Sequence, residues 1–161
     1  GWGQTISKPN VVARMLSLLV QGRTQPLGRV LEVGTGCGYQ AAVLAQLARH
    51  VSSVERIQDL YAMAKRHLAD VGVRNVNVVF GDGMRGYRPS APYDAIVAAA
   101  GGDAIPQAWL EQLAVGGRLV APCTSASGAQ SLVWIEHTVT GFVRHEREPV
   151  QFVPLKSGVV S

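Results

Sequence analysis

The strongest constraint on the fold is a glycine-rich stretch, Glu-Val-Gly-Thr-Gly-Cys-Gly, at residues 32–38. It follows the short, mostly apolar run of residues 30–33 and precedes residues 39–49, whose composition predicts a helix. A strand, a glycine turn and a helix in this order place unpaired backbone N–H groups at the N-terminus of the helix, where they can bind a ligand. The sequence therefore predicts a strand–turn–helix unit with a binding turn, although tight turn geometry alone is an alternative reason for the glycines.

The spacing of the glycines argues against a dinucleotide ligand. A dinucleotide-binding turn has the pattern G-x-G-x-x-G, which would need glycine at the position of Tyr39. The chain instead has Gly34, Gly36 and Gly38, with Glu32 two residues before the first of them. A carboxylate beside the turn suits a ligand with an ammonium group rather than a pyrophosphate. S-adenosylmethionine is such a ligand, and the stretch resembles motif I of the class I methyltransferases.

Two further acids are expected on the same ligand. Residues 50–55 predict a second strand that ends at Glu55, and an acid about 20 residues after the glycine turn can hold ribose hydroxyls. Residues 76–80 predict a third strand, after which Asp82 can accept from an adenine amino group, a plain Asp-Gly turn being the alternative. The expected cofactor-binding residues are Glu32, Gly34, Thr35, Gly36, Gly38, Glu55, Arg56, Gly81, Asp82 and Gly83.

The rest of the chain predicts an α/β fold. Helical periodicity or composition indicates helices at residues 9–20, 57–71 and 105–113, and apolar runs indicate strands at 95–100 and 118–121. Alternation of apolar and polar residues predicts strands at 131–136 and 141–148, with residues 150–155 extended last. This order predicts a Rossmann-like, doubly wound, mostly parallel sheet of about seven strands with an antiparallel edge.

With 161 residues, the chain is expected to form one methyltransferase domain. Within it, residues 1–28 supply an N-terminal loop and helix, residues 29–123 the cofactor-binding core, and residues 130–161 a β-rich C-terminal part. No apolar run approaches the roughly 18 residues of a membrane span, and no signal-peptide pattern opens the sequence. We therefore expect a cytoplasmic protein without a membrane partner.

Charge and metal-ligand patterns point to no further partner. The 15 Lys and Arg residues are scattered, so the net charge of +4 predicts an ordinary solvated surface rather than a nucleic-acid site. The four histidines share no metal-ligand spacing, and Cys37 and Cys123 form no C-x-x-C pair. We expect a monomer with no bound metal and no disulfide.

Beyond motif I, the sequence resembles the protein-L-isoaspartate O-methyltransferase family nearly end to end. The most specific blocks are Gln-Thr-Ile-Ser at residues 4–7 and Val-Pro-Leu at residues 153–155. The resemblance implies methyl transfer from S-adenosyl-L-methionine to the α-carboxylate of L-isoaspartyl, and also D-aspartyl, residues in damaged proteins. S-adenosyl-L-homocysteine is the other product, and the ester initiates repair. Family members carry a further N-terminal segment, so we expect this chain, which lacks an initiator Met, to be truncated.

The same resemblance implies residue roles. Ser7 is the expected catalytic residue, whose neutral hydroxyl would orient the acceptor carboxylate, and a helix cap is the alternative role. Three departures from the family pattern are Cys37 in place of Ser, Lys-Pro-Asn at residues 8–10, and Gly-Gly-Asp at residues 101–103. The last two border the expected substrate mouth and bear on peptide preference. The expected substrate-binding residues are Thr5, Ser7, Ala98, Ala99, Val153 and Leu155.

Two other functions remain open at this stage. One is an S-adenosylmethionine-dependent methyltransferase that acts on nucleic acid or a small molecule, and the other is a cofactor-binding protein without catalysis. Amino-group methyltransferases resemble one another in an Asn/Asp-Pro-Pro-Tyr motif after the fourth strand, where this chain has Ala-Ala-Ala-Gly at residues 98–101. A cytosine C5 enzyme needs Pro-Cys there, whereas Pro122 and Cys123 follow the predicted fifth strand.

Overall fold

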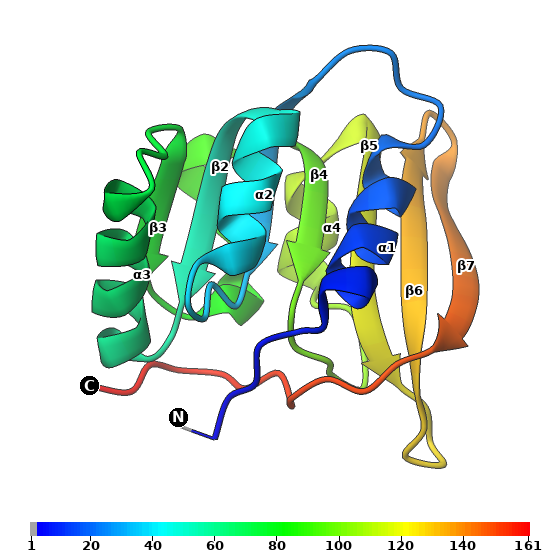
Figure 1. Ribbon diagram of the computed structural model, residues 1–161. Helices are drawn as coiled ribbons and strands as arrows, with labels where there is room; N and C mark the ends of the chain where they lie inside the picture. Colours follow the sequence, from blue (N-terminus) through cyan, green and yellow to red (C-terminus); the bar gives the residue numbers. More distant parts are fainter. Residues whose placement is uncertain (1–2) are drawn as a thin grey trace.

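The computed structural model describes residues 3–161, in which a single seven-stranded sheet is flanked by helices (Figure 1). The strands are β1 (Leu27–Val33), β2 (Ala48–Glu55), β3 (Val76–Phe80), β4 (Tyr93–Ala98), β5 (Leu113–Thr124), β6 (Gln130–Thr138) and β7 (Gly141–Pro149). The helices are α1 (Pro9–Val20), α2 (Tyr39–Leu47), α3 (Gln58–Asp70) and α4 (Gln107–Gln112), with short 3₁₀ turns η1 (Gly83–Arg85) and η2 (Arg88–Ser90). Within the described residues, none of these helices has the length and hydropathy needed to cross a membrane.

The strand order is β3-β2-β1-β4-β5-β6-β7, and the first five of these strands run parallel. Strands β6 and β7 are added antiparallel, as a hairpin at one edge. This arrangement confirms the predicted doubly wound sheet and its antiparallel edge. Because parallel strands point the same way, their carboxyl ends meet along one side of the sheet, which is where ligands bind in such folds.

Alternation along the strands gives the sheet a separate core on each face. Val30 and Val51 pack with α1 and α2, which lie in front of the sheet in Figure 1. Leu31 and Ile96 point the other way and pack against Trp109 of α4, whose side chain is 1% exposed. Both faces of the central strands are therefore buried, as expected for a parallel sheet.

Several predicted boundaries were wrong by two residues. Helix α2 ends at Leu47, because Ala48 already pairs with Leu27 at the start of β2. Strand β4 begins at Tyr93 and ends at Ala98, so Ala99 and Ala100 lie just beyond it, in a bend. Alanine is the strongest helix former and is depleted in strands, so the ends of these segments are set by pairing with neighbouring strands, which composition does not show.

Residues 150–161, here called the C-terminal strap, follow the carboxyl edge of the sheet rather than forming a further strand (Figure 1, orange to red). Residues 150–155 were predicted to be extended, and the one strand-like pairing in this segment is an isolated bridge between Gly101 and Pro154. The N–H of Gly101 donates to the carbonyl of Val153 (2.9 Å), and the N–H of Leu155 donates to the carbonyl of Gly101 (2.8 Å). Within the described residues, the strap makes only isolated bridges, at Pro154 and Val160.

The far end of the C-terminal strap is tied to the start of α3. The N–H of Val160 donates to the carbonyl of Arg56 (2.7 Å), and the N–H of Gln58 donates to the carbonyl of Val160 (2.9 Å). The strap therefore crosses the edge at which the parallel strands end.

Candidate functional site

The glycine turn after β1 has a backbone that other residues rarely adopt. Gly34, Gly36 and Gly38 all have positive φ angles, of 90°, 56° and 92°. An L side chain at any of them would be strained, which explains three glycines in five positions. The turn delivers the chain into α2, whose N-cap is Gly38, and it leaves backbone groups open at the carboxyl edge of the sheet.

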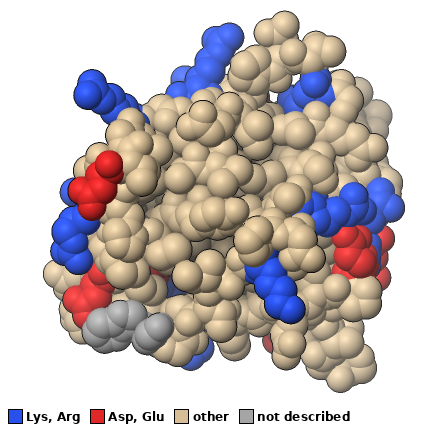
Figure 2. Space-filling view, viewed as in Figure 1, with Lys and Arg blue, Asp and Glu red and all other residues tan. Residues whose placement is uncertain are grey.

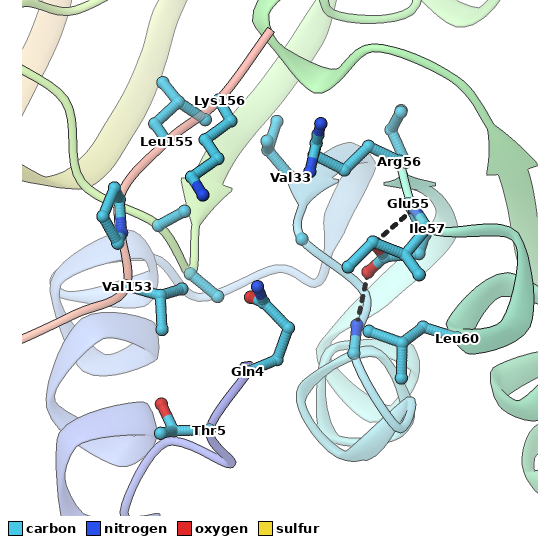
Figure 3. A pocket seen from close by; sticks show the side chains of 16 residues that line it. Gln4, Thr5, Val33, Glu55, Arg56, Ile57, Leu60, Val153, Leu155 and Lys156 are labelled. Carbon is cyan, nitrogen blue, oxygen red and sulfur yellow. Dashed lines mark hydrogen bonds between the residues drawn. The ribbon is translucent and has the colours of Figure 1, made fainter. Parts of the chain in front are cut away.

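Glu55, at the end of β2, closes the turn from the neighbouring strand (Figure 3). One carboxylate oxygen accepts from the N–H of Gly36 (2.9 Å) and the other from the N–H of Ile57 (3.0 Å). The residue is 4% exposed. A carboxylate offers about four acceptor positions, so two remain for the hydroxyl groups of a ligand.

Glu32 lies deeper than a ligand-contacting carboxylate was expected to lie. Its side chain is fully buried between β1 and β2, where one oxygen accepts from the hydroxyl of Ser53 and the other has no partner within residues 3–161. Burial raises the pKa of Glu32 from 4.5 to about 8, with a smaller contribution from the charge of Glu55. Gln40 lies near enough to lower this pKa, although its amide meets hydrogen-bond geometry with no described residue.

The expectation that Glu32 faces an ammonium group directly is therefore corrected. It lines none of the three hollows described below, because alternation along β1 turns it under the turn, towards α2. Thr35 is likewise buried, with its hydroxyl 2.6 Å from that of Ser53. Both side chains support the turn from below, although Thr35, unlike Glu32, also lines the second cavity.

Two small cavities flank the glycine turn. The first has a volume of about 70 Å³ and lies between the turn, the end of β2, the start of α3 and the C-terminal strap. The second, of about 50 Å³, lies between the turn and residues 5–7. Gly34, Gly36 and Ala99 line both cavities, and Thr5 also lines both from the opposite side.

Most residues predicted from the sequence come together at these cavities. The first is lined by Glu55 and Arg56 on one side and by Val153 and Leu155 on the other (Figure 3). Ser7 lines the second cavity. Five segments that are far apart in the chain therefore meet at one place: the N-terminal loop, the glycine turn, the ends of β2 and β4, and the strap.

Asp82 does not reach the first cavity. One of its oxygens accepts from the N–H of Met84 (2.9 Å), which is the turn geometry considered as an alternative, and the other accepts from the N–H of Gly158 (2.9 Å). The guanidinium of Arg56 donates to the carbonyls of Ser157 (3.4 Å) and Gly158 (3.0 Å). Both side chains thus hold the C-terminal strap across the end of the site.

The glycines beside Asp82 are structural rather than ligand-facing. Gly81 and Gly83 line neither cavity. A Cβ on Gly83 would lie 2.5 Å from a methyl group of Val33. The backbone carbonyl of Gly83 accepts from the indole N–H of Trp109 (2.8 Å). Gly83 therefore permits close packing between η1, β1 and α4.

Ala98 is a second correction. It is fully buried in the core on the α4 face, because it is the last residue of β4 and still follows the alternation of the strand. Ala99, one residue later, turns towards the glycine turn and lines both cavities. Of the two alanines, only Ala99 lies where a small residue was predicted to face the site.

Ser7 does not cap a helix. Helix α1 begins at Pro9, its N-cap is Lys8, and the side chain of Lys8 makes no capping hydrogen bond. Within residues 3–161 no hydrogen bond to the hydroxyl of Ser7 is found, and Ser7 lines the second cavity. The structure therefore removes the alternative role considered for this side chain.

Eight residues that line the first cavity were not among the predicted site residues: Gln4, Val33, Val54, Ile57, Leu60, Ala100, Pro154 and Lys156. Figure 3 shows Gln4 extending into the space between Val153 and the end of β2, and Lys156 entering from the strap. Gln4 belongs to the family-specific block at residues 4–7, and this membership could have predicted its place in the site. Lys156 had none, because its place depends on how the strap crosses the edge.

The departure from the family pattern at Gly101 has a local reason. A Cβ there would lie 2.5 Å from the amide nitrogen of Gln130 and 3.0 Å from Cβ of Pro122. Glycine lets the chain approach β5 and β6 closely while both of its backbone groups bind the strap.

Comparison with known proteins places this arrangement in a family. The family model for Protein-L-isoaspartate(D-aspartate) O-methyltransferase matches residues 1–160. Proteins named Protein-L-isoaspartate O-methyltransferase from Methylibium petroleiphilum and Leptothrix cholodnii are 57% and 58% identical to this chain over 98% of its length. The chain spans 60% and 57% of the length of these two relatives.

Solved structures agree with the sequence relatives. A protein-L-isoaspartate O-methyltransferase that is 30% identical superposes with a TM-score of 0.86 over 96% of this chain and 49% of its own. A Plasmodium falciparum beta-aspartate methyltransferase, in complex with S-adenosyl-L-homocysteine, superposes with a TM-score of 0.79 over 96% of this chain and 77% of its own. At 23% identity the latter shows the fold alone.

Proposed function

This chain belongs to the protein-L-isoaspartate(D-aspartate) O-methyltransferase family, and from that premise we propose that it methylates the α-carboxylate of isoaspartyl residues in damaged proteins. The methyl donor would be S-adenosyl-L-methionine. The observation that carries the proposal is the meeting of the glycine turn, Glu55 and Ser7 at the carboxyl edge of the sheet, beneath the family-specific segments at both ends of the chain.

The residues of the first cavity suit this donor. Glu55 keeps two acceptor positions for ribose hydroxyls, and the glycine turn leaves room for close approach of a ligand to the backbone. Glu32, buried beneath the turn with one unpartnered oxygen and a pKa raised to about 8, is mostly protonated near neutral pH, and a positive group bound above the turn would favour its ionised form. When bound, the donor supplies a methyl group made electrophilic by a sulfonium sulfur.

The cavity of about 70 Å³ is smaller than the 300–1,000 Å³ of a typical small-molecule site. Binding of a nucleoside-sized ligand therefore requires movement of the elements that close it. The N-terminal loop is the element best suited to move, because the backbone of residues 5–7 makes no hydrogen bond within the described residues, whereas Gly101, Arg56 and Asp82 hold the C-terminal strap.

The chemistry that we propose needs little from the protein except position. A carboxylate with a pKa near 4 is already ionised at neutral pH, so no general base is required. The negative charge of the acceptor carboxylate and the positive charge of the donor sulfonium cancel towards the transition state. A cation bound to the carboxylate would therefore stabilise the reactants more than the transition state. The neutral hydroxyl of Ser7 can orient the acceptor without that cost, while the strap and the N-terminal loop limit access of water.

Nucleic acid is less well supported as an acceptor. On the face seen in Figure 2, the Lys and Arg side chains form separate groups, most of them near the margins and with Asp and Glu beside some of them, instead of one continuous basic band. Binding to a phosphate backbone normally uses such a band.

The proposal is tested by incubating the full-length protein with S-adenosylmethionine labelled in its methyl group and three acceptors: an isoaspartyl peptide, RNA and double-stranded DNA. Label that enters the peptide and is released as methanol by mild base identifies a carboxyl methyl ester. Base-stable label in nucleic acid would support the alternative methyltransferase. No transfer to any acceptor, with the cofactor bound, would support a cofactor-binding protein. The cytoplasmic location and the monomeric state stay predictions, which cell fractionation and light scattering would test.

A further inference from the structure

A groove of about 810 Å³ adjoins the second cavity. One wall consists of residues 5–8 together with Val11, and the other consists of residues 149–153 at the start of the C-terminal strap. Thr5 and Ser7 line both the groove and the second cavity, so the groove leads directly to the proposed acceptor position.

Both walls present backbone groups that an extended peptide can use. Within the described part of the chain, the N–H and carbonyl groups of residues 5–7 and of Gln151 have no hydrogen-bond partner. Ile6 is 72% exposed and offers an apolar contact. Unpaired backbone with alternating side-chain contacts is how proteins hold extended peptides.

Lys8 is the one charged residue among those that line the groove. It is exposed, and no acid within residues 3–161 forms an ion pair with it. The next basic residue along α1, Arg14, is paired with Glu148 at 2.5 Å and contributes little net charge. Lys8 is therefore the one charge on the lining of the groove itself.

The position of Lys8 is unfavourable for the helix itself. It is the N-cap of α1, where an acidic or hydroxyl side chain would stabilise the helix and a cation is repelled by the helix dipole. No acid in the first turn compensates for the charge. A residue that opposes local stability in this way is expected mainly where function requires it.

We propose that Lys8 is a specificity-determining residue that favours acceptor peptides with an acidic side chain next to the isoaspartyl residue. The inference rests on the proposed function, since the acceptor must be a peptide. Lys8 directly follows Ser7, so its ammonium group is within reach of side chains one or two residues from the acceptor carboxylate. It acts on the flank of the peptide and leaves the reacting carboxylate free of a cation.

The test compares kcat/KM of the full-length protein on isoaspartyl peptides that differ only in one flanking residue: Glu, Gln or Lys. Each residue is placed in turn before and after the isoaspartyl residue. A solvent-exposed ion pair predicts a preference for the Glu peptide over the Gln peptide of about two- to fivefold at low salt on one flank. The preference should shrink as salt rises from about 0.05 M to about 0.5 M.

Lys8→Met should abolish this preference, and Lys8→Glu should reverse it in favour of the Lys peptide. Lys65→Met, which removes an exposed lysine of α3 outside the groove, is the matched control and should leave the preference unchanged. Melting temperatures check that each variant is folded.

A Glu-to-Gln ratio near one on both flanks, or a ratio unaffected by Lys8→Met, would overturn the role of Lys8 while the proposed function stands. Absence of methyl transfer to every isoaspartyl peptide would overturn the proposed function itself.

Discussion

Replacement of Glu32 by Gln should stabilise the protein relative to the native chain, by an amount that grows as pH rises. The folded protein holds the proton of Glu32 more tightly than the unfolded chain, because burial raises its pKa from 4.5 to about 8. Below pH 4.5 the carboxyl group is protonated in both states and costs nothing. Between 4.5 and 8 the unfolded chain loses this proton first, so the free energy of unfolding falls with pH.

The magnitude follows from the same shift. Each pH unit corresponds to about 1.4 kcal/mol, so the ionised carboxylate costs on the order of 4–5 kcal/mol above pH 8 relative to an ordinary glutamate. Gln has the same shape, can accept from Ser53 through its amide oxygen, and does not ionise. The advantage of Glu32→Gln over the native protein should therefore be nearly constant below pH 5 and grow by several kcal/mol towards pH 8.

The assay is urea unfolding at half-unit steps from pH 4.5 to 8.5, on native protein, Glu32→Gln and Glu111→Gln. Glu111 is exposed and pairs with Arg88 at the surface, so its substitution should give a small and flat difference. The reasoning would be refuted if the native and Glu32→Gln profiles ran parallel over the whole range, since Glu32 would then titrate alike in both states.

Three further outcomes follow from single contacts. Glu55→Ala should weaken binding of S-adenosyl-L-homocysteine by about 1–3 kcal/mol, because charge-assisted hydrogen bonds are lost, and unchanged affinity in calorimetry would contradict the ribose assignment. Ser7→Ala should lower turnover on an isoaspartyl peptide about tenfold or more, while cofactor affinity and melting temperature stay nearly unchanged. Normal turnover in this variant would show that Ser7 does not act on the acceptor. Gly83→Ala should cost about 1–3 kcal/mol of stability, since its Cβ would lie 2.5 Å from Val33, whereas Gly81→Ala meets its nearest atom at 3.7 Å; equal unfolding midpoints would be the contrary result.

The sheet and much of its site were accessible from the sequence because their signals are local. Positive φ at three alternate positions demands glycine, and the spacing of Gly34, Gly36 and Gly38 therefore revealed the turn. Apolar runs separated by helical periodicity revealed the parallel order. Glu55 followed from its distance along the chain after that turn, which is a property of the fold.

Other features depend on long-range packing and could not be predicted. Asp82 was assigned to adenine because it follows β3, yet its free oxygen is held by Gly158, about half a chain length away. Whether Ala98 or Ala99 faces the site depends on where β4 ends, which alanines do not indicate. The place of Lys156 at the first cavity depends on the path of the C-terminal strap, which is held by hydrogen bonds to Gly101, Arg56 and Asp82, far away in the sequence.

The central claim is that the site selects the isoaspartyl carboxylate. The most direct measurement is the initial rate of methyl ester formation by the full-length protein on two peptides of the same sequence, one with L-isoaspartate and one with normal L-aspartate at a single position. The account predicts saturable methylation of the isoaspartyl peptide and only background incorporation into its aspartyl twin. Equal rates on the two peptides, or methylation of the aspartyl peptide alone, would contradict it.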